Sequence, residues 1–118
     1  MKLFDEAVPS EAAARVIAFR RALERALPGA IEAVVLFGSR ARGDARPDSD
    51  YDLAVLLRGD LARNPDVKAK VADEAFEHVI DGIELTPMPL RGDYLEPIGG
   101  HYRTELARRI AREGILVP

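Results

Sequence analysis

The chain has 118 residues, a formal net charge of −3 and no cysteine. This length fits one domain with a real hydrophobic core, so residues 1–118 are interpreted as a single domain. The acidic balance argues against direct nucleic-acid binding, and the absence of cysteine excludes a disulfide framework and a thiolate metal site. Because the sequence has neither an apolar leader nor a run of membrane-spanning length, it favours a cytoplasmic protein without a membrane partner.

The first third of the chain predicts a lead-in, a helix and a strand. Residues 1–9 are expected to be extended. Ser10 is predicted to cap a helix with one apolar stripe, which a Pro-Gly pair at 28–29 ends. Ile31–Phe37 then ends in a continuous apolar run. Such a run is typical of a strand that is covered on both faces.

The middle of the chain predicts a second strand, a helix and a third strand. A Gly-Ser turn and a short basic helix lead to the strand Tyr51–Leu57. Asn64, followed by proline, predicts a capped helix start, and Phe76 is expected on the apolar side of that helix. The third strand is predicted over Ile83–Leu90, where two prolines favour an edge position.

The last part of the chain predicts an irregular segment over 91–100 and then an amphipathic helix that Gly114 ends. Ile115–Val117 is expected to add a short strand or to dock on the fold. The resulting order is helix, strand, strand, helix, strand, helix. It predicts an α/β (α+β) fold with a small mixed sheet covered by helices.

Polar residues that suit phosphate chemistry surround the start of the second strand. Asp50 and Asp52 stand two residues apart, so on a strand both side chains point to one face, roughly 6.5–7 Å apart along the backbone. Carboxylates at that separation can converge on one hard cation or share two. Upstream, Gly38 and Ser39 open a helical turn whose N–H groups can hold an anion. A phosphate cradle beside a metal-binding carboxylate pair is the layout needed for metal-assisted phosphoryl or nucleotidyl transfer.

Arg40 and Arg42 follow the Gly-Ser turn. Guanidinium groups bind phosphate bidentately, so these residues are candidate partners of a triphosphate, with Arg42 preferred. The alternative is that both are ordinary surface charges.

The spacing of Gly-Ser, ten residues and Asp-x-Asp resembles the signature of the polymerase-beta-like nucleotidyltransferases. The resemblance extends from about Ile31 to the C-terminus and is densest over 36–56. Within that superfamily, the chain resembles the stand-alone minimal nucleotidyltransferases of prokaryotes. This resemblance implies a palm-like core, two Mg²⁺ ions held by Asp50 and Asp52, and ATP as the substrate. It also implies that Ser39 holds the distal phosphates.

The resemblance further implies a third carboxylate on a following strand, which completes the metal site. Glu84 is the candidate, because it is the polar member of an alternating apolar pattern. It is Glu where the family usually has Asp, and a surface-facing Glu on an edge strand is the alternative.

The expected acceptor also comes from the resemblance. Minimal nucleotidyltransferases are paired with HEPN-type toxin proteins, which they neutralise by transferring AMP to a tyrosine, so the chain would be an antitoxin. One alternative is a binding module that lost activity and neutralises its partner by complex formation. A second alternative is nucleotidyl transfer to a small molecule, which the absence of an evident substrate domain disfavours.

Overall fold

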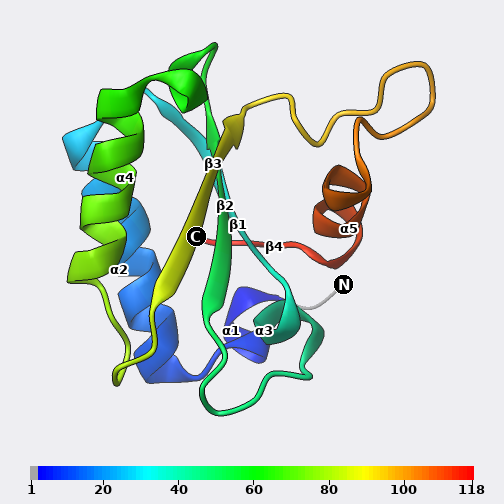
Figure 1. The fold of residues 1–118 in the computed structure, drawn as a ribbon. Helices are drawn as coiled ribbons and strands as arrows, with labels where there is room; N and C mark the ends of the chain where they lie inside the picture. Colours follow the sequence, from blue (N-terminus) through cyan, green and yellow to red (C-terminus); the bar gives the residue numbers. More distant parts are fainter. Residues whose placement is uncertain (1–2) are drawn as a thin grey trace.

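A mixed sheet forms the centre of the molecule in a computed structural model that describes residues 3–118. The strands lie in the order β3-β2-β1-β4, with β1 antiparallel to both of its neighbours and β2 parallel to β3 (Figure 1). The predicted α/β fold with a small mixed sheet is therefore confirmed. Along the chain the elements are α1 (Phe4–Ala7), α2 (Ser10–Ala26), β1 (Ile31–Phe37), α3 (Ser39–Arg42), β2 (Tyr51–Leu57), the 3-10 turn η1 (Leu61–Arg63), α4 (Pro65–Glu77), β3 (Leu85–Arg91), α5 (Glu105–Glu113) and β4 (Ile115–Leu116).

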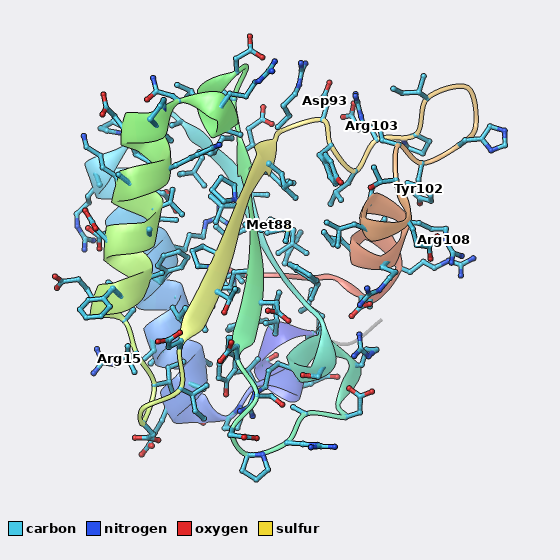
Figure 2. All side chains as sticks on the ribbon, viewed as in Figure 1. Arg15, Met88, Asp93, Tyr102, Arg103 and Arg108 are labelled. Atoms are coloured by element: carbon cyan, nitrogen blue, oxygen red, sulfur yellow. The ribbon has the colours of Figure 1, made fainter. Side chains whose placement is uncertain are left out.

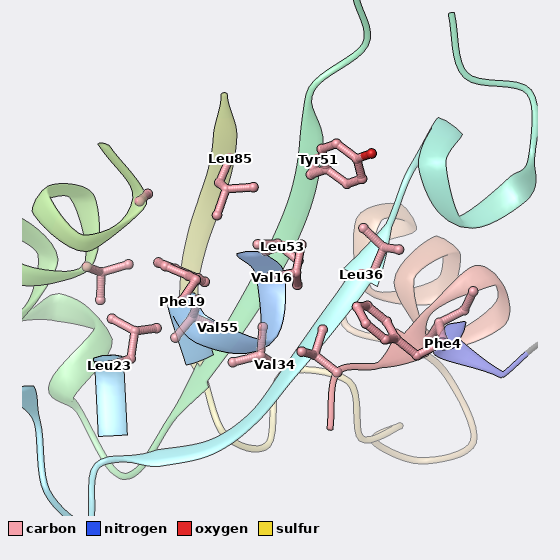
Figure 3. Packing of buried hydrophobic residues seen from close by; sticks show 14 of the residues in the cluster. Phe4, Val16, Phe19, Leu23, Val34, Leu36, Tyr51, Leu53, Val55 and Leu85 are labelled. Atoms are coloured by element: carbon pink, nitrogen blue, oxygen red, sulfur yellow. The ribbon is translucent and has the colours of Figure 1, made fainter. Parts of the chain in front are cut away.

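Helices α2 and α4 cover one face of the sheet (Figure 1). Figure 3 shows the packing on this side, with Phe19 and Leu23 of α2 close to Val34 of β1 and to Leu53 and Val55 of β2. All five side chains are fully buried. Removing such side chains from water is the dominant favourable contribution to folding, so this layer holds the sheet in place.

The opposite face of the sheet carries a smaller apolar cluster under α5. It includes Ala54 and Leu56 of β2 and Ile110 of α5. Side chains alternate between the two faces along a strand, so the even-numbered positions of β2 face α5. Asp52 belongs to that series, and the fold therefore places it on the α5 side of the sheet.

Strand β3 is an edge strand, as its prolines predicted. Pro87 and Pro89 stand opposite residues of β2, and no strand within residues 3–118 pairs with the other side of β3. The strand begins at Leu85 rather than at the predicted Ile83, because Ile83 and Ile80 exchange backbone hydrogen bonds with each other in a tight turn.

Several helix predictions hold and others need correction. Asn64 caps α4 as expected, accepting hydrogen bonds from two N–H groups of its first turn. Ser10 lies inside α2 instead of capping it, and the predicted extended lead-in contains α1. Phe76 is 80% exposed, so its predicted place on the apolar side of α4 is wrong. Within residues 3–118 no helix is both long and apolar enough to cross a membrane.

Candidate functional site

The candidate site begins where β1 ends against the start of β2. Phe37, the last residue of β1, is paired with Asp52, and Gly38 follows with a φ of +75°. L-residues with a side chain rarely adopt this conformation. A Cβ on Gly38 would also collide with Asp52 Oδ2. Glycine is thus required at position 38 for two reasons, backbone conformation and the close approach of the carboxylate.

The register between β2 and β3 brings a hydroxyl to the carboxylate pair. Thr86 stands opposite Asp52, and its Oγ1 donates a hydrogen bond to Asp50 Oδ2 at 3.2 Å. Two carboxylates and a hydroxyl therefore lie together on the α5 side of the β2–β3 pair. These are hard oxygen donors of the kind that Mg²⁺ prefers.

The environment of Asp52 disfavours its negative charge. The side chain is half-buried. Burial raises the pKa of the Asp52 carboxyl, and the negative charge of Asp50 raises it further. Glu113 acts in the same direction, whereas Arg42 and Arg109 oppose the rise in the Asp52 pKa. Carboxylates that repel one another at a partly dry site are stabilised by a bound cation, so the residues present fit a divalent metal ion.

The structure does not bring Glu84 together with Asp50 and Asp52 as a set of metal ligands. Within residues 3–118, no three His, Cys, Asp or Glu side chains are grouped so that they could hold a metal ion. Glu84 precedes β3, is exposed, and borders a shallow hollow against α4. The residue that β3 places opposite Asp52 is Thr86, because the strand starts one residue after Glu84.

Arg40, which the sequence predicted as a phosphate partner, holds the loop that leads to Asp50. Its Nε and Nη2 donate to the carbonyl of Ser49 at 3.1 and 2.8 Å, and Nη2 also donates to the carbonyl of Pro47 at 3.2 Å. Its guanidinium lies 4.5 Å from the centre of the Tyr51 ring. These contacts commit the Arg40 side chain to the loop and to the first residue of β2.

Arg42 and Ser39 lie at the Gly-Ser turn as predicted from the motif. Arg42 Nη1 donates to Glu113 Oε2 at 2.8 Å, and Arg42 Nε donates to Asp44 Oδ2 at 3.3 Å. Ser39 is the first residue of α3 and is half-buried. The first turn of a helix leaves backbone N–H groups without intrahelical partners, so this turn keeps donors for an anion.

Sequence reasoning missed two members of the site, Thr86 and Glu113. Thr86 could have been found from the β2–β3 register, but single-sequence patterns do not fix which residues of two strands pair. Glu113 is 75 positions from Gly38, whose backbone N–H it accepts at 2.7 Å. The packing of α5 on the sheet and the pairing of β4 with β1 bring it there, and no local motif marks it.

The fold and the site together define a class of protein. A Gly-Ser turn faces a strand that begins with two carboxylates, on a mixed sheet backed by two helices. The family model "Polymerase beta, Nucleotidyltransferase" matches residues 23–91. That segment is more than half of the chain and contains α3, β2 and β3. The chain belongs to this nucleotidyltransferase family, and membership supports a general role in nucleotidyl transfer.

A solved structure agrees with this assignment at the level of the fold. It is that of a proposed nucleotidyltransferase from Sulfolobus solfataricus, with a TM-score of 0.56 and 19% sequence identity. The match covers 98% of this chain and 89% of the Sulfolobus chain. No curated protein sequence matches the chain.

Proposed function

We propose that this protein transfers a nucleotidyl group from a nucleoside triphosphate, with ATP as the donor, in a reaction that depends on Mg²⁺. The observation that supports this most directly is the contact between Gly38 and Asp52. The turn that offers N–H donors for phosphate touches the carboxylate that would hold the metal. A metal-bound triphosphate needs both groups within one small volume.

The proposal gives each residue of the site a role in binding the metal or the triphosphate. Asp50 and Asp52 would hold the cation, which when bound would lower the pKa of the attacking hydroxyl and neutralise the charge of the leaving pyrophosphate. Ser39 and the backbone N–H of Gly38 orient the distal phosphates, and Arg42 binds them through its guanidinium. Because little covalent chemistry falls to the protein, positioning and electrostatics would carry the rate.

The acceptor in this proposal is a protein, a HEPN-type toxin whose tyrosine receives AMP, and the chain is the corresponding antitoxin. The resemblance of the sequence to the stand-alone minimal nucleotidyltransferases supports this acceptor. The loop between β3 and α5 offers surface for it, since Ile98 is 60% exposed and Tyr102 is 38% exposed. Arg103 and Asp93 form an ion pair at 3.1 Å across this loop, and Figure 2 shows the two side chains close together.

Thr86 favours a second candidate, a module that neutralises its partner by binding alone. The family's third carboxylate is expected on a strand after the Asp-x-Asp pair, and β3 places Thr86 opposite Asp52. A threonine hydroxyl is a neutral ligand and a weak base. A site with two carboxylates could therefore still bind nucleotide while transferring it slowly or not at all.

One experiment separates the two candidates. The protein is incubated with isotopically labelled nucleoside triphosphates, Mg²⁺ and the product of the neighbouring reading frame. The mass of each protein is then measured by mass spectrometry. Transfer predicts an added AMP mass on a tyrosine of the partner, which Asp52→Asn abolishes. A stable complex that forms without any adduct would reject the enzymatic proposal and support the binding module.

A further inference from the structure

The carboxylate of Glu113 occupies the position where the proposed site needs an anion. Its Oε2 accepts hydrogen bonds from the Gly38 backbone N–H at 2.7 Å and from Arg42 Nη1 at 2.8 Å. Its Oε1 lies 3.7 Å from Arg109 Nε, and the side chain is only 13% exposed. Glu113 thus joins one backbone donor and two guanidinium groups around a single negative charge.

The backbone of Glu113 is held firmly, so its side chain is the part that can move. Ala107 and Ile110 anchor α5, at 0% and 1% exposure. Gly114 follows Glu113. A Cβ on Gly114 would collide both with the carbonyl oxygen of Ile110 and with the side chain of Val35 in β1. Glycine therefore lets the end of α5 sit directly on β1, and the chain continues at once into β4. Figure 1 shows the C-terminal end of α5 directed toward α3.

Apart from these three partners, the surroundings of Glu113 disfavour its negative charge. It is the last residue of a helix, where the helix dipole disfavours an anion. It also lies near enough to Asp52 to contribute to the raised pKa of that carboxyl. Two hydrogen bonds and the ion pair with Arg109 therefore hold this carboxylate against two repulsive influences.

We infer that Glu113 is a built-in substitute for a substrate phosphate, which the phosphate chain of the nucleotide displaces. On displacement, the Gly38 N–H and Arg42 donate their hydrogen bonds to phosphate oxygens instead of the carboxylate, and Arg109 pairs with the phosphate charge instead of the charge of Glu113. Arg109 thereby becomes a phosphate-binding residue supplied by α5. This inference rests on the proposed function, because the phosphate chain is that of the nucleotide.

A purely structural role for Glu113 makes the opposite prediction. If the carboxylate only orients Arg42 and the Gly-Ser turn, its removal weakens anion binding. If it is a competitor, its neutralisation strengthens anion binding, because a glutamine carbonyl accepts hydrogen bonds less strongly than a carboxylate. The sign of the change in affinity therefore distinguishes the two roles.

The test uses inorganic tripolyphosphate without metal, measured by calorimetry on the full chain. Glu113→Gln should bind it about fivefold to tenfold more tightly than the wild type. Glu105→Gln, on the same helix but paired with Arg108, is the matched control and should change nothing. Equal or weaker binding by a folded Glu113→Gln protein, or no binding by either protein, overturns the inference.

The role of Arg109 is tested in the Glu113→Gln background. Arg109→Gln should lose about threefold in tripolyphosphate affinity, whereas Arg108→Gln should lose none. Should Glu113→Gln fail to fold, the wild type supplies the readout through the amide resonance of Gly38. Its chemical shift should change as tripolyphosphate is added, in proportion to the fraction of protein bound, and should stop changing when the protein is saturated. Binding that leaves the Gly38 amide unmoved overturns the inference.

These outcomes are separable from those of the proposed function. If Glu113→Gln binds tripolyphosphate more tightly but neither protein binds ATP with Mg²⁺, the anion site stands and the nucleotidyl-transfer proposal fails. If the wild type transfers AMP and Glu113→Gln shows no gain in anion affinity, the transfer proposal stands and the role of Glu113 fails.

Discussion

The Cα of Gly38 approaches the carboxylate of Asp52 so closely that no side chain fits between them. This contact joins the end of β1 to the start of β2 at the pair Phe37–Asp52. It also keeps the Gly-Ser turn and the carboxylate pair in fixed relation. A change at either residue should therefore affect both the stability of the fold and the binding of nucleotide.

Gly38→Ala should destabilise the protein by about 2 kcal/mol or more, because it adds a collision to the strain of a positive φ. Gly29→Ala is the matched control, since Gly29 has a φ of +74° but no atom within 4 Å of an added Cβ. It should cost only about 1 kcal/mol. Thermal unfolding of both variants measures the difference. Equal losses would mean that the contact with Asp52 contributes nothing.

Asp52→Asn should remove the metal dependence of ATP binding. In calorimetry with Mg²⁺, the affinity for ATP should fall at least about tenfold, because the half-buried carboxylate is the member of the pair nearest to the Gly-Ser turn. Without Mg²⁺, the variant and the wild type should bind ATP with similar, weak affinity. Unchanged affinity in the presence of Mg²⁺ would contradict the assignment of Asp52 as a metal ligand.

The raised pKa of Asp52 also predicts a dependence of stability on pH. Its folded-state pKa lies above the unfolded value of 3.8, since burial and Asp50 disfavour the charged form. As pH rises from 3.8 through the folded-state pKa, the folded protein retains a proton that the unfolded chain has lost, so the contribution of Asp52 to stability falls. Asp52→Asn should therefore raise the Tm at pH 7 by about 1 to 3 °C. This advantage should vanish below about pH 4 and should shrink when Mg²⁺ is added to the wild type. An advantage that grows as the pH falls would have the wrong sign.

Arg40 and Arg42 should differ in what they affect. Arg40→Ala removes hydrogen bonds to the loop and the contact with the Tyr51 ring, and should cost about 1 to 2 kcal/mol of stability. Arg42→Ala should cost less stability but should lose more affinity for tripolyphosphate. Melting curves and calorimetry on both variants test this division. The reverse pattern would assign the phosphate role to Arg40.

Thr86 and Glu84 offer a direct test of the third ligand position. Thr86→Asp places a carboxylate opposite Asp52 and should tighten Mn²⁺ or Mg²⁺ binding while lowering the Tm of the metal-free protein, because three carboxylates then repel one another. Glu84→Gln should leave metal affinity and AMP transfer unchanged, since Glu84 lies outside the set. Loss of transfer in Glu84→Gln alone would restore the role that the sequence suggested for this residue.

The sequence predicted best those features that depend on local chemistry. Both central strands were predicted with their observed bounds, because each is a continuous apolar run between turn residues. Asn64 followed by proline marks a helix start through its own hydrogen bonds. Phe76 was misplaced because Val71 and Ala75, four residues apart, face the core, and the small Ala75 takes the place expected for the larger side chain.

Features that depend on long-range pairing were not predictable from the sequence. The α1 helix has four residues, too short for any periodic pattern. The roles of Thr86 and Glu113 follow from strand register and from the pairing of β4 with β1, and neither leaves a local signal. The Asp-x-Asp pair and the Gly-Ser turn were recognisable because their spacing lies within one stretch of chain.

The pairing of β1 with both β2 and β4 has a consequence for synthesis on the ribosome. The β1–β2 pair can form soon after β2 emerges, but the other edge of β1 stays open until Ile115 and Leu116 have been made. An open strand edge can pair with other chains, so this interval carries a risk of aggregation. Until shortly before the end of that interval, Glu113 has not been synthesised either. A nucleotide in the surrounding solution can therefore reach the Gly38 N–H before the protein's own carboxylate does.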